Sequence, residues 1–285
     1  MELIIILILC LLATTKVTLQ ATFAKKNVHT AIDGIFFNGL IFLFSALVFL
    51  KNAFCGNLFI ALFGLSFGIL TVVFQLFYIK AMSCGNVSLT VLIVNLSMII
   101  PIIVSVIFYY GKLNLLKIIG IILTVTAFSL NINKSEKSED LKKWFLFALL
   151  ASFANAAMSV CQQIFGRTRW SGDSHSFVAL SYITAAAVSI CIYVVLRLTG
   201  SGISFKIKPY FFCVAFLLGA VLGVFQALNT RAVATIDSVL LFPTYNGGTL
   251  IFSSLSGVLI LKDKLKLNQI ISLFTGVVAI IIMNI

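Results

Sequence analysis

A lysine stands inside the first long apolar stretch of the chain. Lys16 lies about eight residues, or roughly 12 Å of helix, before the polar residues that end this stretch. An ionisable side chain at this depth is costly in lipid, and a lysine can extend only part of that distance toward the headgroups. Lys16 is therefore predicted to face a wet space or an anion, with Gln20 one turn further along the same helix face. A lysine that only reaches a headgroup or a packing partner is the alternative.

Several uncharged polar side chains also interrupt the apolar stretches. An amide in hydrocarbon must find a hydrogen-bond partner, so it points toward the protein interior. That direction serves helix packing and substrate contact equally well, and both readings stay open for each residue. With Lys16 and Gln20, the candidate substrate-binding residues are Gln75, Asn95, Gln162, Gln163, Gln226, Tyr245 and Asn246.

Prolines and paired glycines mark the predicted bends. Proline removes one helix hydrogen bond, and neighbouring glycines loosen the next turn. Pro101, Pro243, Gly247 and Gly248 are therefore predicted as gating kinks, with static kinks as the alternative.

The acidic residues narrow the chemistry further. All 8 lie in connections or first helical turns, so no carboxylate is predicted deep in a helix to bind a lipophilic cation. A lysine without a buried carboxylate favours an anionic or zwitterionic ligand. The two histidines, His29 and His175, fall in connections, and the 6 cysteines form no CxxC pair. The sequence therefore predicts no catalytic residue, no metal site and no cofactor.

The elements that position these residues are membrane helices. The chain has 285 residues, of which 61% are hydrophobic and 10% charged, with a mean hydropathy of +1.16. This composition excludes a soluble or disordered protein and indicates an all-α membrane protein. The net charge of +12 is spread singly along the chain, which argues against nucleic-acid binding. The predicted helices are 3–24, 31–50, 58–81, 87–110, 113–132, 144–166, 176–198, 209–231, 236–261 and 265–284.

The two halves of the chain share spaced polar residues. An offset of 151 relates Gly68, Phe74-Gln75 and Lys80-Ala81 to Gly219, Phe225-Gln226 and Arg231-Ala232, and it also relates Asn95 to Asn246. Gln20 and Gln162 form a weaker match. We predict a first five-helix repeat at 1–133, a polar connector at 134–143 and a second repeat at 144–285. Since five is odd, the repeats must be inverted, as in many secondary transporters.

Ten helices in two such repeats resemble the EamA-type family of the drug/metabolite transporter superfamily. Residues that match its pattern lie toward the end of each half. They are Lys80-Ala81, Pro101, Tyr110-Gly111-Lys112-Leu113, Lys117 and Gly120, and Arg231-Ala232, Leu261-Lys262-Asp263-Lys264-Leu265, Gln269 and Gly276. The glutamate of the family's Leu-Gly-Glu-x-Leu motif is absent from both halves.

The resemblance implies a secondary transporter of a small metabolite that works by alternating access, and metabolite export is expected. A flippase for a lipid-linked sugar with the same fold is the main alternative. A membrane-embedded enzyme is less favoured, because the sequence offers no nucleophile, base or metal cluster.

The expected location is the plasma (inner) membrane, with both termini on one side. The resemblance implies a cytoplasmic side, whereas the excess of Lys and Arg in the odd-numbered connections favours the reverse. The expected partners are a small-molecule substrate and the lipid bilayer but no nucleic acid, and a homodimer is an open alternative.

Overall fold

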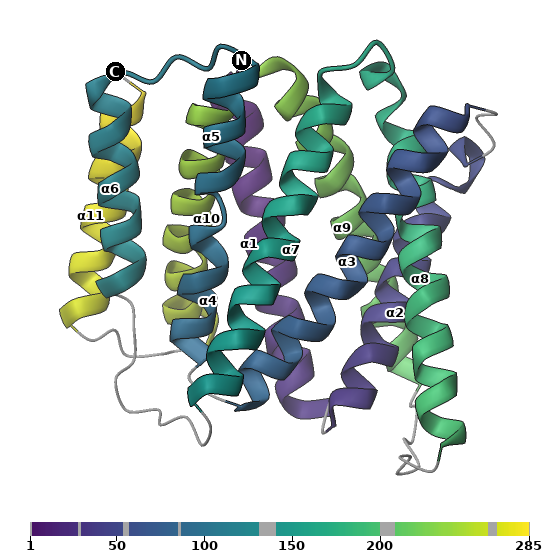
Figure 1. Ribbon diagram of the computed structural model, residues 1–285. Helices are drawn as coiled ribbons and strands as arrows, with labels where there is room; N and C mark the ends of the chain where they lie inside the picture. The colour runs from purple at the N-terminus through teal and green to yellow at the C-terminus, as the bar shows by residue number, and fades with distance from the viewer. Residues whose placement is uncertain are drawn as a thin grey trace.

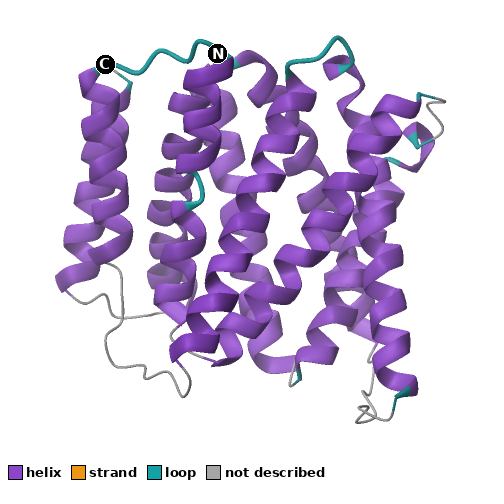
Figure 2. Cartoon of the chain, viewed as in Figure 1, coloured by secondary structure: helices purple, strands orange, loops and turns teal. Residues whose placement is uncertain are grey.

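The fold is built from helices alone in the part of the chain that is described. A computed structural model describes residues 2–27, 30–53, 57–84, 87–130, 141–199, 209–261 and 267–284, and these hold no strand (Figure 2). The predicted all-α fold class is confirmed. In chain order (Figure 1), the elements are α1 (Glu2–Asn27), α2 (Ala31–Val48), η1 (Leu50–Asn52), α3 (Leu58–Cys84), α4 (Val87–Leu96), α5 (Ile99–Phe108), α6 (Leu115–Leu130), α7 (Leu141–Gly166), η2 (Ser171–Asp173), α8 (Ser174–Leu198), α9 (Pro209–Thr235), α10 (Ser238–Leu261) and α11 (Leu267–Met283).

The outer surface of the bundle is apolar. Six segments among the described residues are long and apolar enough to cross a membrane, and α2, α6 and α11 contribute shorter apolar helices. Large side chains such as Leu62, Ile122 and Phe274 are 54%, 58% and 70% exposed. Such a surface would be unfavourable in water and suits lipid, where the helix satisfies its own backbone groups. The chain is a multi-pass integral membrane protein.

The two halves run in opposite directions through the bundle. Both chain ends lie at one end of the molecule, α1 runs away from that end, and α7 runs toward it (Figure 1). Contacts between the halves are exchanged in the same sense, because α3 packs on α7 and α8 while α9 packs on α1 and α2. This is the arrangement expected for inverted halves. The boundaries at 1–133, 134–143 and 144–285 stay predictions, and most of the connector lies outside the described residues.

At two matched glycines, neighbouring helices pack so closely that a larger side chain would not fit. On α9, a Cβ added to Gly219 would lie 2.7 Å from the carbonyl oxygen of Ile41 on α2. On α3, Gly68 meets α8 at Ser181 and Thr184. Small residues let helix backbones approach where lipid gives no hydrophobic driving force for association. These glycines allow the close contacts of α9 with α2 and of α3 with α8, which join the two halves.

The helix predicted over 87–110 is in fact broken. α4 ends at Leu96, residues 97 and 98 form a turn, and α5 begins at Ile99. Pro101 has no N–H for the Ser97 carbonyl, and its ring disfavours a continuous helix at that carbonyl. The Ser97 carbonyl instead accepts the Ile100 N–H at 3.1 Å. Pro101 therefore sits in the first turn of α5, where proline is tolerated.

Candidate functional site

Lys16 lies deep in the bundle without a partner. It stands past the middle of α1, is surrounded by protein, and still keeps a half-exposed side chain. No described residue gives it a hydrogen bond or an ion pair. The wet environment of Lys16 stays a prediction, and Lys16 is the one cation that α1 supplies from a described side chain.

The neighbouring candidate Gln20 is bound to protein. Its Nε2 donates to Oδ1 of Asn38 on α2 at 2.8 Å, and Asn38 donates onward to the Gly34 carbonyl at 2.9 Å. This chain of bonds ties α1 to α2 toward the end of the bundle away from the chain termini. In this conformation Gln20 serves packing.

Three further polar side chains resemble Lys16 in exposure. Gln75 and Tyr78 on α3 and Asn95 on α4 are each half-buried and form no side-chain hydrogen bond within the described chain. Tyr78 stacks on Phe74 with ring centroids 5.3 Å apart, and sequence reasoning did not select it. We call Lys16, Gln75, Tyr78 and Asn95 the unpaired polar set. Its members carry one cation, two amides and one phenol, and no carboxylate.

The candidates on α7 and α9 have the opposite character. Gln162 is 3% exposed, donates from Nε2 to Thr230 Oγ1 at 2.8 Å, and accepts from Asn229 Nδ2 at 3.1 Å. Thr230 in turn donates to the Gln226 carbonyl at 2.8 Å, and Gln226 is 6% exposed. We call Gln162, Gln226, Asn229 and Thr230 the amide seam, because they join α7 to α9 near the end that holds the termini.

Gln163 extends the polar contacts of α7 to α10. Its Nε2 donates to Ser238 Oγ at 2.9 Å, and the side chain is fully buried. Its Oε1 has no hydrogen-bond partner among the described residues. An unpaired buried acceptor lowers stability by about 1–3 kcal/mol. The position of this amide is therefore determined by the packing of the surrounding side chains.

The break between α4 and α5 is held by α7. Ser152 Oγ donates to the Ile93 carbonyl at 3.0 Å, and Asn155 Nδ2 donates to Ser97 Oγ at 2.7 Å. The Ile93 carbonyl is available because the Ser97 N–H bonds the Val94 carbonyl instead, at 3.1 Å. Sequence reasoning missed Ser97, Ser152 and Asn155. In the sequence, the only indication was that the small polar residues Ser152 and Asn155 are three positions apart in a predicted helix.

The predicted kink region of α10 is continuous helix. Pro243 lies inside α10 with no break, and it is buried. Gly248 lies against α1, where an added Cβ would be 2.5 Å from Cys10 Sγ, while Gly247 has only ordinary contacts. Both glycines face neighbouring helices here, which is a packing role.

Tyr245 and Asn246 on α10 lie beside the α4–α5 break. Asn246 Nδ2 donates to the Phe242 carbonyl at 2.8 Å and lies 3.7 Å from Met98 Sδ. Tyr245 is half-buried, and its ring lies 5.7 Å from that of Phe225. The two residues therefore connect α10 to α9 and to the residues of the break.

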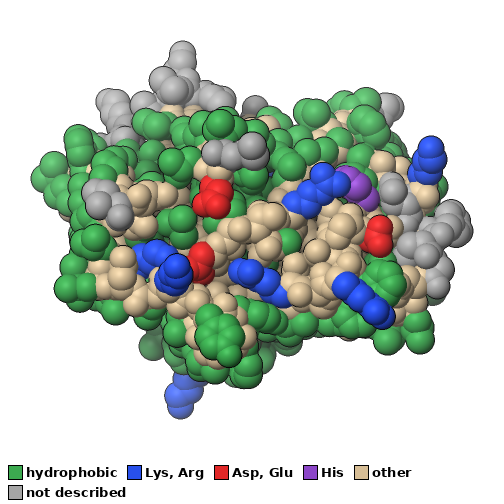
Figure 3. Space-filling model, turned by 90° about the horizontal axis from the view of Figure 1, so that it is seen from above, with side chains coloured by type: hydrophobic (Ala, Val, Ile, Leu, Met, Phe, Trp, Pro, Cys, Tyr) green, Lys and Arg blue, Asp and Glu red, His purple; other side chains and the backbone are tan. Residues whose placement is uncertain are grey.

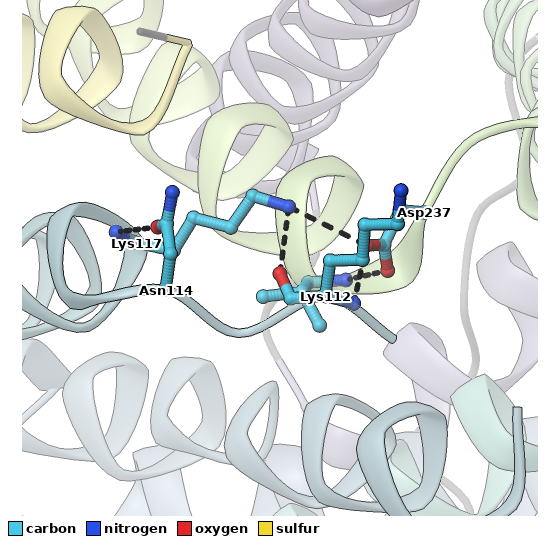
Figure 4. A network of polar contacts seen from close by, with 5 residues as sticks. Lys112, Asn114, Lys117 and Asp237 are labelled. Atoms are coloured by element: carbon cyan, nitrogen blue, oxygen red, sulfur yellow. Dashed lines mark hydrogen bonds and ion pairs between the residues drawn. The ribbon is translucent and has the colours of Figure 1, made fainter. Parts of the chain in front are cut away.

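Polar contacts also close the end of the bundle that holds both termini, which we call the terminal end. Asp237 directly precedes α10 there, and its Oδ1 accepts the Val239 N–H at 3.0 Å. Its Oδ2 accepts the Lys112 N–H at 3.1 Å and lies 3.4 Å from Lys117 Nζ (Figure 4). Lys117 also donates to the Lys112 carbonyl at 2.8 Å. A view onto this end shows its acidic and basic side chains within a rim of hydrophobic ones (Figure 3).

The arrangement fits binding and passage better than bond chemistry. Among the described residues, no three His, Cys, Asp or Glu side chains are grouped to hold a metal ion. The unpaired polar set is spread over α1, α3 and α4, and the amide seam and the Asp237 contacts lie toward the terminal end. Accessible polar groups inside an apolar shell can bind a small solute and pass it on.

Comparison with known proteins agrees with this geometry. Residues 4–133 match the EamA-like transporter family. A solved crystal structure, described only as that of a protein, superimposes with a TM-score of 0.74 at 12% sequence identity, covering 99% of this chain and 95% of its own. That likeness shows the fold alone. No curated protein matches the chain in sequence at a significant level. The resemblance predicted from the sequence is confirmed, and the chain is a membrane transporter of the drug/metabolite type whose residues 4–133 match the EamA-like transporter family.

Proposed function

We propose that the protein is a secondary transporter that moves a small anionic or zwitterionic metabolite by alternating access. The observation that carries this proposal is Lys16, a deep, accessible cation without an ion-pair partner among the described residues. An isolated charge at membrane depth is energetically unfavourable, and an anionic group of a bound ligand would neutralise it. The substrate supplies the carboxylate or phosphate that no described residue offers to Lys16.

The described carboxylates support an anionic ligand by their positions. Asp33 completes a capping box with Thr30 at the start of α2, and Asp237 caps α10 and pairs with Lys117. Both are committed to helix ends, and neither belongs to the unpaired polar set. A passage with a lysine and no competing carboxylate attracts anions and disfavours cations.

The uncharged members of the set suit the rest of the substrate. Gln75 and Asn95 each offer an amide donor and acceptor, and Tyr78 offers a hydroxyl beside an aromatic face. Such groups bind hydroxyl, amide or planar parts of a metabolite. The flippase and enzyme alternatives would require a lipid-linked substrate or a reactive group, and no feature of the described residues favours either. We therefore propose that the chain is not an enzyme.

For its setting, we propose the plasma (inner) membrane with both termini on the cytoplasmic side. The two ends do lie together in Figure 1, whereas most of the Lys and Arg residues fall in the odd-numbered connections, which the predicted topology assigns to the opposite end. The positive-inside rule would place that opposite end in the cytoplasm. A protease-accessible tag on the C-terminus, probed in intact cells and in inverted vesicles, decides between the two orientations.

The experiment is a ligand panel on purified protein. Thermal unfolding in detergent is followed with an anionic, a zwitterionic, a neutral and a cationic metabolite, namely phosphoenolpyruvate, glutamine, glucose and spermidine. A ligand at 100 times its dissociation constant stabilises by about 2.7 kcal/mol, which such a scan detects. We expect stabilisation by the first two compounds and not by spermidine.

The panel is repeated on Lys16→Gln, with Lys51→Gln as the matched control. Lys51 is an exposed lysine at the terminal end, so its removal changes the net charge equally without touching the unpaired polar set. We expect Lys16→Gln to lose the stabilisation by anions and Lys51→Gln to keep it. Equal stabilisation by spermidine in both variants would overturn the anionic assignment, and a requirement for a polyprenyl phosphate would favour the flippase.

A further inference from the structure

The two ends of the bundle differ in how tightly they are closed. We propose that the terminal end is a gate held shut in this conformation, that the opposite end is open to the unpaired polar set, and that the Asp237–Lys117 pair biases the protein toward this state. The proposal rests on alternating access as the proposed function. It names the residues that regulate access to the same site.

The amide seam is the first closure at the terminal end. Gln162, Asn229 and Thr230 are 3%, 8% and 0% exposed, and their side chains bond to one another between α7 and α9. Gln163 adds a bond to α10. Solvent does not reach amides that are buried and paired in this way, so the seam blocks passage between α7 and α9.

An apolar cluster supplements the seam. It gathers residues of α1, the α4–α5 break, α9 and the start of α10, all toward the terminal end. Its buried members include Leu9, Met98, Val233, Ile236, Val239 and Leu241. Each of these is at most 3% exposed. A dry apolar plug excludes both water and a charged solute.

Among the described residues, the matched positions toward the opposite end form no equivalent closure. The predicted offset of 151 relates Gln226 and Asn229 of the seam to Gln75 and Tyr78 on α3. These two are half-exposed and unpaired, whereas their counterparts are buried. They lie in the part of α3 nearest the opposite end. Because inverted halves exchange conformations when a transporter switches, unequal burial of matched residues indicates which end is open.

The Asp237–Lys117 ion pair distinguishes the terminal end from the opposite end. Asp237 binds its own helix start, the loop at Lys112 and the Lys117 ammonium, so it joins α10 to the loop that precedes α6. The matched residues in the sequence are Asn86, which lies outside the described residues, and Gln269. Neither is charged, so the repeat-related pair cannot form a salt bridge. Within the described residues, charge attraction therefore favours closure at the terminal end.

Accessibility of introduced thiols tests the proposal without a known substrate. In a background with all six native cysteines replaced, Gln75→Cys reports on the opposite end and Gln226→Cys on the terminal end. A membrane-impermeant thiol reagent is added to right-side-out and to inverted vesicles. We expect Gln75→Cys to react from one side and Gln226→Cys to be protected from both.

Removal of the Asp237 charge is the decisive step. Asp237→Asn is expected to raise the labelling rate of Gln226→Cys by about fivefold or more and to lower that of Gln75→Cys, since about 1 kcal/mol shifts a two-state balance by that factor. Asp173→Asn is the matched control, because it removes an exposed acid at the same end that makes no ion pair within the described chain. If Gln226→Cys does not fold, Asn229→Cys replaces it.

The outcomes separate this proposal from the proposed function. Free labelling of Gln226→Cys in the unmodified background, or equal effects of the two aspartate variants, would overturn the gate. Loss of anion stabilisation in the ligand panel together with the expected labelling would contradict only the substrate assignment. Labelling of both reporters from the same side would show that the two ends do not alternate.

Discussion

The α4–α5 pair and α10 occupy matched places in the two halves, yet one is broken and the other is continuous. Each carries a matched asparagine, Asn95 or Asn246, and each contains one proline. Pro101 follows a break, whereas Pro243 lies inside unbroken helix. Since a proline is present in both, proline alone does not explain the break.

The neighbouring helices explain the difference. The offset of 142 that relates Gln20 to Gln162 also relates Cys10 on α1 to Ser152 on α7, and Ala13 to Asn155. Ser152 bonds the Ile93 carbonyl at 3.0 Å, while Cys10 Sγ lies 3.6 Å from the Tyr245 carbonyl. A hydroxyl is a good donor and a thiol a weak one. On α7, Ser152 donates to a carbonyl that the break leaves free. On α1, no donor of equal strength faces α10, so α10 keeps its own helix hydrogen bonds.

The largest effect is expected at the contact that keeps α10 against α1. Gly248→Ala adds a Cβ at 2.5 Å from Cys10 Sγ, which should lower the free energy of unfolding by about 1–3 kcal/mol through overpacking. Thermal unfolding in detergent measures the loss. Gly247→Ala is the control, because its Cβ has no neighbour nearer than 3.6 Å. Equal losses in both variants, or no relief from Cys10→Ala in the Gly248→Ala background, would contradict the packing account.

The next effect concerns the support of the break by α7. Asn155→Ala removes the donor to the buried Ser97 hydroxyl, and it should cost about 1–2 kcal/mol of stability because that hydroxyl is left unpaired. A double-mutant cycle with Ser97→Ala measures the interaction. Full additivity of the two losses would show that the hydrogen bond does not stabilise the break.

Exchange of the prolines should separate the two helices. Pro243→Ala gives the Val239 carbonyl of α10 a helix donor and should stabilise the protein by about 1 kcal/mol after loss of the ring's packing. Pro101→Ala should change stability less, since the carbonyls near the break already have partners. Unfolding midpoints of the two variants are compared directly. A greater gain from Pro101→Ala would mean that proline strain, and not α7, governs the break.

The smallest effect is expected from exchange of the matched donors. Ser152→Cys weakens the bond to the Ile93 carbonyl and should lower stability by about 0.5–1 kcal/mol. Cys10→Ser places a stronger donor near the Tyr245 carbonyl, and it should leave stability within about 0.5 kcal/mol of the original. Thermal scans of both variants and of the double exchange provide the measurement. Unchanged stability in Ser152→Cys, or a loss in Cys10→Ser as large as that in Ser152→Cys, would refute the role given to donor strength.

The sequence alone was sufficient for the class and the framework of the protein. Long apolar stretches with few charges can be satisfied as helices in lipid, and the pattern of these stretches predicted ten of them. The unpaired lysine was also visible, because the cost of Lys16 in an apolar stretch does not depend on its neighbours. Matched residues such as Gly68 and Gly219 further indicated two halves.

Tertiary structure decided which polar residues are paired and where the fourth span breaks. Gln75 and Gln226 are the same residue type at matched positions, yet one is half-exposed and the other buried, because the two halves hold different conformations. The break at Ser97 depends on Ser152 and Asn155, more than 50 residues away in the chain. A local pattern cannot show such contacts, since burial and hydrogen-bond partners are set by the helices that pack alongside.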